Sequence, residues 1–98
     1  MNKFILTIDQ GTSATKAVLF DQNARIISRG DVPSESHFPQ PGFVEQDPVV
    51  LFENTLAAAG RCISKAQETD SSAVERIEAV GISNQRETFL LWDKQGNP

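Results

Sequence analysis

Short segments of β-strand character at both ends of the chain enclose one segment with helical periodicity. Residues 4–9 are apolar and lead into the turn formers Asp9-Gln10-Gly11-Thr12-Ser13. Residues 15–21 are expected to place Ala17 and Leu19 on one face of a second strand, and residues 25–32 form a third, more polar segment. Because short turns connect these three segments, we expect them to pair as an antiparallel meander.

A helix is expected from Pro48 to about Gln67, after an extended loop over residues 33–46 that contains three prolines. Asp47 can accept hydrogen bonds from the free amides of the first turn. Pro48 suits the first helical position because its missing N–H would have no partner there. The apolar side chains that follow recur every three or four residues and predict one buried face: Val49, Phe52, Leu56, Ala59 and Ile63.

Two further strands are expected after the helix, at residues 77–83 and 88–92. The resulting order, βββαββ, is typical of an α/β, ribonuclease-H-like subdomain. A right-handed crossover through the helix would place the first of these strands parallel to the opening strand. A turn at residues 93–98 normally leads into a partner strand, so we expect an incomplete fold with half of a hairpin present.

The composition excludes several classes of function. The chain has 98 residues and a formal net charge of −4, which argues against nucleic-acid binding through a basic surface. The single cysteine, Cys62, excludes an internal disulfide and a Cys/His zinc site, and its neighbours on the helix predict a buried, inert thiol. No run approaches membrane-spanning length, and Asp9 interrupts the opening apolar run before a signal peptide can form. We therefore expect a cytoplasmic location, with neither nucleic acid nor a membrane as a partner.

The turn after the first strand has the parts of a phosphate-binding loop. Gly11 allows the backbone to approach an anion, and the hydroxyls and amides of Thr12 and Ser13 can donate to phosphate oxygens. Lys16 adds a positive charge, and Asp9 could hold Mg²⁺ directly or through water. The alternative is a plain hairpin turn, in which Gly11 supplies an unusual φ and the hydroxyls cap backbone groups.

A second polar segment, residues 81–88, separates the last two predicted strands. Burying its consecutive polar residues would cost free energy, so we expect them to face a cleft or solvent. Arg86 and Glu87 offer donors and acceptors to a hydroxylated ligand, whereas the alternative is an ordinary solvated loop.

Three motifs together resemble glycerol kinases, which are members of the FGGY carbohydrate kinase family. They are Asp9-Gln10-Gly11-Thr12-Ser13, the loop at residues 38–48, and Asn84-Gln85-Arg86-Glu87-Thr88, and they occur here in the family's order. The resemblance implies an actin-like ATPase fold of two ribonuclease-H-like domains. It also implies that Mg-ATP and a polyol, glycerol, meet in the cleft between these domains for phosphoryl transfer.

Carried over by position, the resemblance assigns roles to several residues of the two segments. Arg86 and Glu87 would hydrogen-bond the glycerol hydroxyls, and Asp9 would lie near the metal. The residues along the ATP phosphates would be Thr12, Ser13, Ala14 and Lys16.

Two departures from the family's usual pattern affect this interpretation. The glycerol kinase pattern has a hydroxyl residue where this chain has Ala14, and arginine where it has Lys16. Ala14 offers only its backbone N–H, and Lys16 keeps the charge without the planar fork of a guanidinium. Lysine at this position also resembles xylulokinase-like members, so a different sugar substrate is an alternative.

The resemblance implies that the catalytic base and the adenosine-binding segments lie downstream of residue 98. Residues 1–98 are therefore expected to be the N-terminal part of the kinase's first domain, without the second domain, without a catalytic residue and inactive alone. A hypothesis of another class is a non-catalytic module that self-associates through an unpaired edge strand at residues 88–92.

Overall fold

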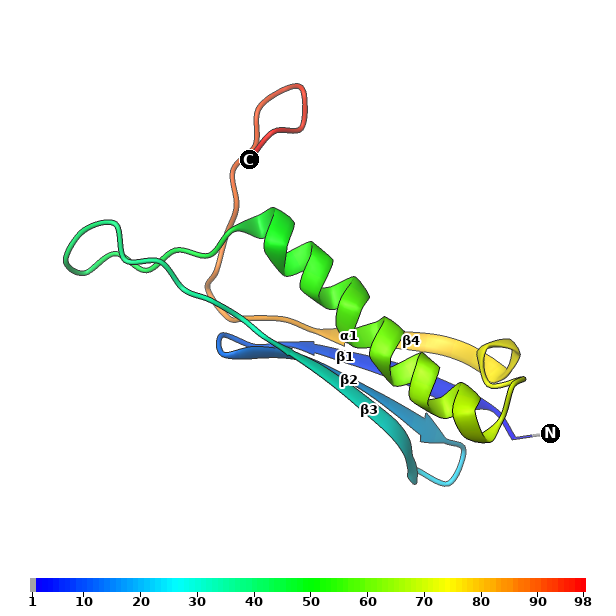
Figure 1. Ribbon diagram of the computed structural model, residues 1–98. Helices are drawn as coiled ribbons and strands as arrows, with labels where there is room; N and C mark the ends of the chain where they lie inside the picture. Colours follow the sequence, from blue (N-terminus) through cyan, green and yellow to red (C-terminus); the bar gives the residue numbers. More distant parts are fainter. Residues whose placement is uncertain (1) are drawn as a thin grey trace.

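The computed structural model describes residues 2–98 and contains one four-stranded sheet with a long helix on one face (Figure 1). The strands are β1 (Phe4–Gln10), β2 (Ala14–Asp21), β3 (Ile26–Pro33) and β4 (Ile77–Ser83), and their order in the sheet is β3-β2-β1-β4. The predicted antiparallel meander is confirmed, and β4 pairs parallel to β1 as the crossover predicted. The crossover consists of helix α1 (Pro48–Thr69) and the short 3-10 helix η1 (Val74–Arg76).

Helix α1 begins where the sequence predicted and ends two residues later than expected, at Thr69. The Asp47 carboxylate accepts a hydrogen bond of 2.9 Å from the Val49 N–H, and Pro48 occupies the first turn. Among the described residues no helix is long and apolar enough to cross a membrane.

The buried face of α1 differs from the predicted one. Ala58, Cys62 and Ala66 are buried against the sheet, whereas Val49, Phe52 and Leu56 are 52–60% exposed. The predicted Ala59 and Ile63 are only partly buried at the edge of the core. Only small side chains fit on the face of α1 that contacts the sheet, because the helix lies very close to β3. A Cβ on Gly30 would be 2.5 Å from the Ala58 carbonyl oxygen.

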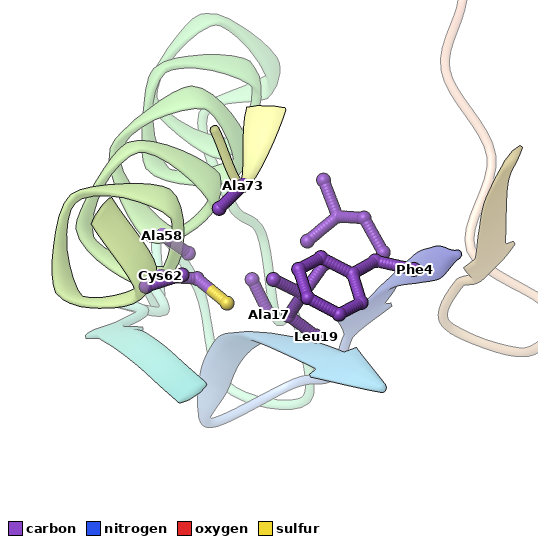
Figure 2. Close-up of a cluster of buried hydrophobic side chains, with 8 residues drawn as sticks. Phe4, Ala17, Leu19, Ala58, Cys62 and Ala73 are labelled. Carbon is purple, nitrogen blue, oxygen red and sulfur yellow. The ribbon is translucent and has the colours of Figure 1, made fainter. Parts of the chain in front are cut away.

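The core between α1 and the sheet is formed by alternate residues of β1 and β2 (Figure 2). Phe4 and Leu6 point toward the helix from β1, and Ala17 and Leu19 do so from β2. This alternation sends Asp9 and its cross-strand partner Lys16 to the opposite face of the sheet. The predicted buried thiol of Cys62 is confirmed, with the side chain fully buried in this core.

The predicted strand at residues 88–92 is wrong, and the observed order is βββαβ. After β4 the chain leaves the sheet (Figure 1), and no described strand pairs with residues 88–92. The apolar run predicted a strand, but without a neighbouring strand its N–H and C=O groups have no ladder to join, and Phe89 and Leu91 are 83% and 77% exposed. The expected turn is present, closed by a hydrogen bond of 3.0 Å from the Gly96 N–H to the Asp93 carbonyl.

Candidate functional site

The loop at residues 11–13 connects β1 to β2 and exposes the side chains of Thr12 and Ser13. The Gly11 N–H closes the turn by donating to the Ala14 carbonyl over 3.0 Å. Gly11 does not have a positive φ, but a Cβ there would lie 3.1 Å from the Ala14 oxygen, a tight contact that glycine avoids. Within residues 2–98, the Thr12 and Ser13 hydroxyls cap no backbone group, so the plain-turn alternative lacks its expected hydrogen bonds.

The loop is held through its carbonyl groups. Within residues 2–98, no oxygen accepts a hydrogen bond from the N–H of Thr12 or Ser13, which leaves both amides available to an anion. The three consecutive carbonyls each accept one hydrogen bond, from Gln85 Nε2 to Gly11 (3.3 Å), from Gln46 Nε2 to Thr12 (2.8 Å) and from the Ser34 N–H to Ser13 (2.9 Å).

The segment at residues 84–88 approaches this loop through Gln85. Gln85 Nε2 also donates to Gln46 Oε1 over 2.6 Å, and the Thr88 hydroxyl donates to Gln85 Oε1 over 3.0 Å. Arg86 and Glu87 are exposed, and their side chains have no hydrogen-bond or ion-pair partner among the described residues. The segment is therefore anchored at one residue and presents the next two to solvent.

Glu87 has a backbone conformation that residues other than glycine rarely adopt. Its φ of 59° lies in the left-handed region, which costs a residue with a Cβ about 1 kcal/mol or more. Such strain is often found at ligand-binding positions, where the surroundings hold the residue in place. This conformation belongs to a residue that the sequence predicted to bind substrate.

Asp9 and Lys16 occupy facing register positions of β1 and β2, and Ser83 of β4 faces Asp9 from the other side. All three lie on the sheet face opposite α1, at the end of the strands next to the loop. The described residues include no group of three His, Cys, Asp or Glu side chains that could hold a metal. A single carboxylate such as Asp9 fits Mg²⁺ only in the way this ion is often bound, with one or two protein ligands, water and substrate phosphates.

The structure thus brings together two of the predicted elements, the loop at residues 11–13 and the segment at residues 84–88. The sequence did not indicate the side chains that join them, Gln46 and Gln85. Both lie inside motifs that the sequence analysis singled out, and a primary amide can donate and accept at once. That dual capacity was the only signal available, because contacts over 39 and 74 residues leave no trace in local spacing.

Comparison with known proteins gives one family throughout. Residues 4–98 match the N-terminal domain of the FGGY family of carbohydrate kinases. A glycerol kinase from Leifsonia xyli subsp. xyli is 46% identical over 99 residues, which is 100% of this chain and 19% of the relative. The chain therefore spans about a fifth of the length of this curated relative.

Solved structures show the same fold. A xyloylose kinase from Brucella ovis superposes with a TM-score of 0.81 at 26% identity, covering 96% of this chain and 19% of that one. A glycerol kinase from Plasmodium falciparum, solved with ADP, gives 0.66 at 28% identity and covers 95% and 18%. The predicted ribonuclease-H-like, actin-like ATPase architecture is confirmed, apart from the missing last strand.

Proposed function

Because this chain belongs to the FGGY family of carbohydrate kinases, we propose that residues 1–98 form the N-terminal part of the first domain of a glycerol kinase. The reaction transfers the terminal phosphoryl group of ATP to a glycerol hydroxyl and yields glycerol 3-phosphate and ADP. One observation carries the proposal: Gln85, in the segment that presents Arg86 and Glu87, donates to the loop whose amides have no acceptor among the described residues. A phosphate donor and a hydroxylated acceptor must meet in such a way for direct transfer.

The loop is assigned to the ATP phosphates. Thr12 and Ser13 supply N–H and hydroxyl donors, and Ala14 supplies only an N–H. Lys16 adds a positive charge that offsets the charge of the transferring group. Asp9 would hold Mg²⁺, directly or through water, and that ion would neutralise phosphate oxygens when bound.

Arg86 and Glu87 are assigned to glycerol. An arginine donates and a carboxylate accepts, so neighbouring glycerol hydroxyls can bind both. The attacking hydroxyl must also lose a proton to a base. We assign that base to a carboxylate outside residues 1–98 and expect the chain alone to lack kinase activity.

A xylulokinase-like activity is the second candidate, and Lys16 favours it because xylulokinase-like members resemble this chain there. The two candidates are separated with a hybrid kinase, in which residues 1–98 replace the aligned segment of the Leifsonia xyli enzyme. ADP formation is measured with glycerol and with xylulose as acceptor. We expect turnover with glycerol at least tenfold above that with xylulose, and a folded, soluble hybrid that uses neither acceptor would overturn the proposal.

A further inference from the structure

Two glutamine side chains from distant parts of the chain hold the loop at residues 11–13. Gln46 lies just before α1, and Gln85 follows β4. We propose that Gln46 and Gln85 are positioning residues that orient the amides of this loop toward the ATP phosphates. The inference rests on the proposed function for its ligand and on the hydrogen bonds for its geometry.

The planarity of the peptide bond links each held carbonyl to the direction of the next amide. In a trans peptide the C=O of one residue and the N–H of the next point in opposite directions. Gln85 holds the Gly11 carbonyl, so the Thr12 N–H points away from Gln85. Gln46 holds the Thr12 carbonyl, so the Ser13 N–H points away from Gln46. Each glutamine therefore sets the direction of one amide that has no acceptor within residues 2–98.

The hydrogen-bond network also fixes which end of each glutamine amide faces the loop. Gln85 Oε1 accepts from the Thr88 hydroxyl, so Nε2 is the group left for the Gly11 carbonyl. Gln46 Oε1 accepts from Gln85 Nε2, so Nε2 of Gln46 is directed at the Thr12 carbonyl, with the Ser36 hydroxyl as a second acceptor at 3.1 Å. Glutamate of the same shape would keep the accepting roles and lose every donated bond.

This arrangement connects the two halves of the site. Gln85 directly precedes Arg86, so one backbone segment carries both the phosphate-loop anchor and a proposed glycerol ligand. Gln46 has no such neighbour. Gln46→Glu, which keeps the acceptor for Gln85 Nε2, should therefore affect ATP alone, whereas loss of Gln85 should affect both substrates.

The first test uses steady-state kinetics of the hybrid kinase with four variants: Gln46→Ala, Gln46→Glu, Gln85→Glu and the control Gln40→Glu. We expect both Gln46 variants to raise KM for ATP about fivefold or more, and Gln46→Glu, which still accepts from Gln85 Nε2, to change KM for glycerol less than twofold. Gln85→Glu should raise both constants. The control Gln40→Glu introduces the same negative charge as Gln46→Glu, in the same loop. The Gln40 side chain has no hydrogen-bond partner among the described residues, so this variant should change neither the KM for ATP nor the KM for glycerol.

The second test uses the 98-residue chain itself and needs no activity. Amide NMR shifts of Thr12 and Ser13 are compared between the unaltered chain, Gln46→Ala and Gln85→Ala. Gln46→Ala should shift the Ser13 amide most, and Gln85→Ala the Thr12 amide.

The outcomes separate the two proposals. An inactive hybrid overturns the proposed function, and the NMR shifts then decide the positioning role alone. An active hybrid with unchanged KM for ATP in both Gln46 variants overturns the positioning role. The same conclusion follows if the Thr12 and Ser13 amide shifts are unchanged in Gln46→Ala and Gln85→Ala.

Discussion

Two threonines on adjacent strands differ in whether their hydroxyl has a partner. Thr15 on β2 is fully buried under α1, and its hydroxyl has no hydrogen-bond partner within the described residues. Thr7 on β1 donates from its hydroxyl to the Val18 carbonyl over 3.1 Å. A buried hydroxyl without a partner costs free energy, whereas a satisfied one contributes about 1 kcal/mol.

We predict that Thr15→Val raises the free energy of unfolding by about 1 kcal/mol. Valine has nearly the size of threonine and lacks the buried hydroxyl that has no partner among the described residues. The matched variant Thr7→Val should lower the free energy of unfolding by about the same amount. Urea unfolding followed by circular dichroism measures both. A loss of stability in Thr15→Val as large as that in Thr7→Val would contradict the account of this buried site.

Single residues of the candidate site were partly predictable from the sequence. Gly11, Thr12 and Ser13 stand in a turn whose residue types suit phosphate, and within residues 2–98 the Thr12 and Ser13 amides have no acceptor. The roles of Gln46 and Gln85 were not predictable, because they depend on how the loop before α1 and the end of β4 meet at the hairpin. Local pattern carries no information on such contacts.

At the scale of elements, the packing of α1 against β3 depends on the absence of a side chain at Gly30. A Cβ there would lie 2.5 Å from the Ala58 carbonyl oxygen and 2.6 Å from the Cys62 nitrogen, both backbone atoms that cannot turn aside. We predict that Gly30→Ala lowers the free energy of unfolding by about 1–3 kcal/mol, since the helix must move from the sheet.

The control for this prediction is Gly81→Ala in β4. A Cβ at Gly81 would meet nothing within 4 Å, so its substitution should change the free energy of unfolding by less than about 0.5 kcal/mol. Chemical denaturation of both variants gives the comparison. Equal stability of the Gly30 and Gly81 variants would show that α1 does not pack as closely as described.

The turn between α1 and η1 is stabilised by the Asp70 carboxylate. Hydrogen bonds from the Ser72 hydroxyl and N–H, with a smaller effect from Arg76 at 3.1 Å, lower the pKa of Asp70 below its usual value of 3.8. Because the pKa is lower in the folded chain, the Asp70 carboxylate stabilises the fold above about pH 4, and this contribution disappears as pH falls through the folded pKa.

We predict that Asp70→Asn lowers the melting temperature at pH 7 and that the difference in melting temperature from the unaltered chain narrows as the pH falls below about 4. Thermal melts across this pH range measure the difference. The control is Glu68→Gln, because the Glu68 carboxylate has no hydrogen-bond or ion-pair partner among the described residues. A difference for Asp70→Asn that stays constant with pH would contradict the assigned hydrogen bonds.

Helix α1 shows why the position of an element was easier to predict than the face that it buries. Its start follows from Asp47-Pro48, a local signal that the structure confirms. Its buried face does not follow from hydrophobicity, because the stripe with the largest apolar residues stays exposed while Ala58, Cys62 and Ala66 contact the sheet. The apolar run at residues 88–92 failed as a strand for a related reason, since a strand requires a partner that the described residues do not supply.

At the scale of the whole molecule, β4 is an edge strand with apolar side chains exposed. Val80 and Ile82 are 53% and 71% exposed, and no described strand pairs with the outer edge of β4. Such edges favour pairing with another chain. We therefore expect any self-association to use the outer edge of β4 in place of residues 88–92.

We predict that the 98-residue chain forms dimers or higher oligomers at high concentration, and that Ile82→Lys lowers the fraction associated. Lysine on an edge strand opposes edge-to-edge pairing. Sedimentation velocity over a range of concentrations provides the measurement. A monomer at every concentration, or association that Ile82→Lys leaves unchanged, would exclude β4 as the contact.

We propose that one chain carries a phosphate loop and a polyol-binding segment of a glycerol kinase. The most direct test is the KM of the hybrid kinase for each substrate after Arg86→Ala, with Arg29→Ala on β3 as the control. A hydrogen bond from a charged group contributes roughly 1.5–3 kcal/mol, so we predict that Arg86→Ala raises KM for glycerol about tenfold to a hundredfold and leaves KM for ATP nearly unchanged. An Arg86→Ala hybrid that binds glycerol as well as the Arg29→Ala control would contradict the account.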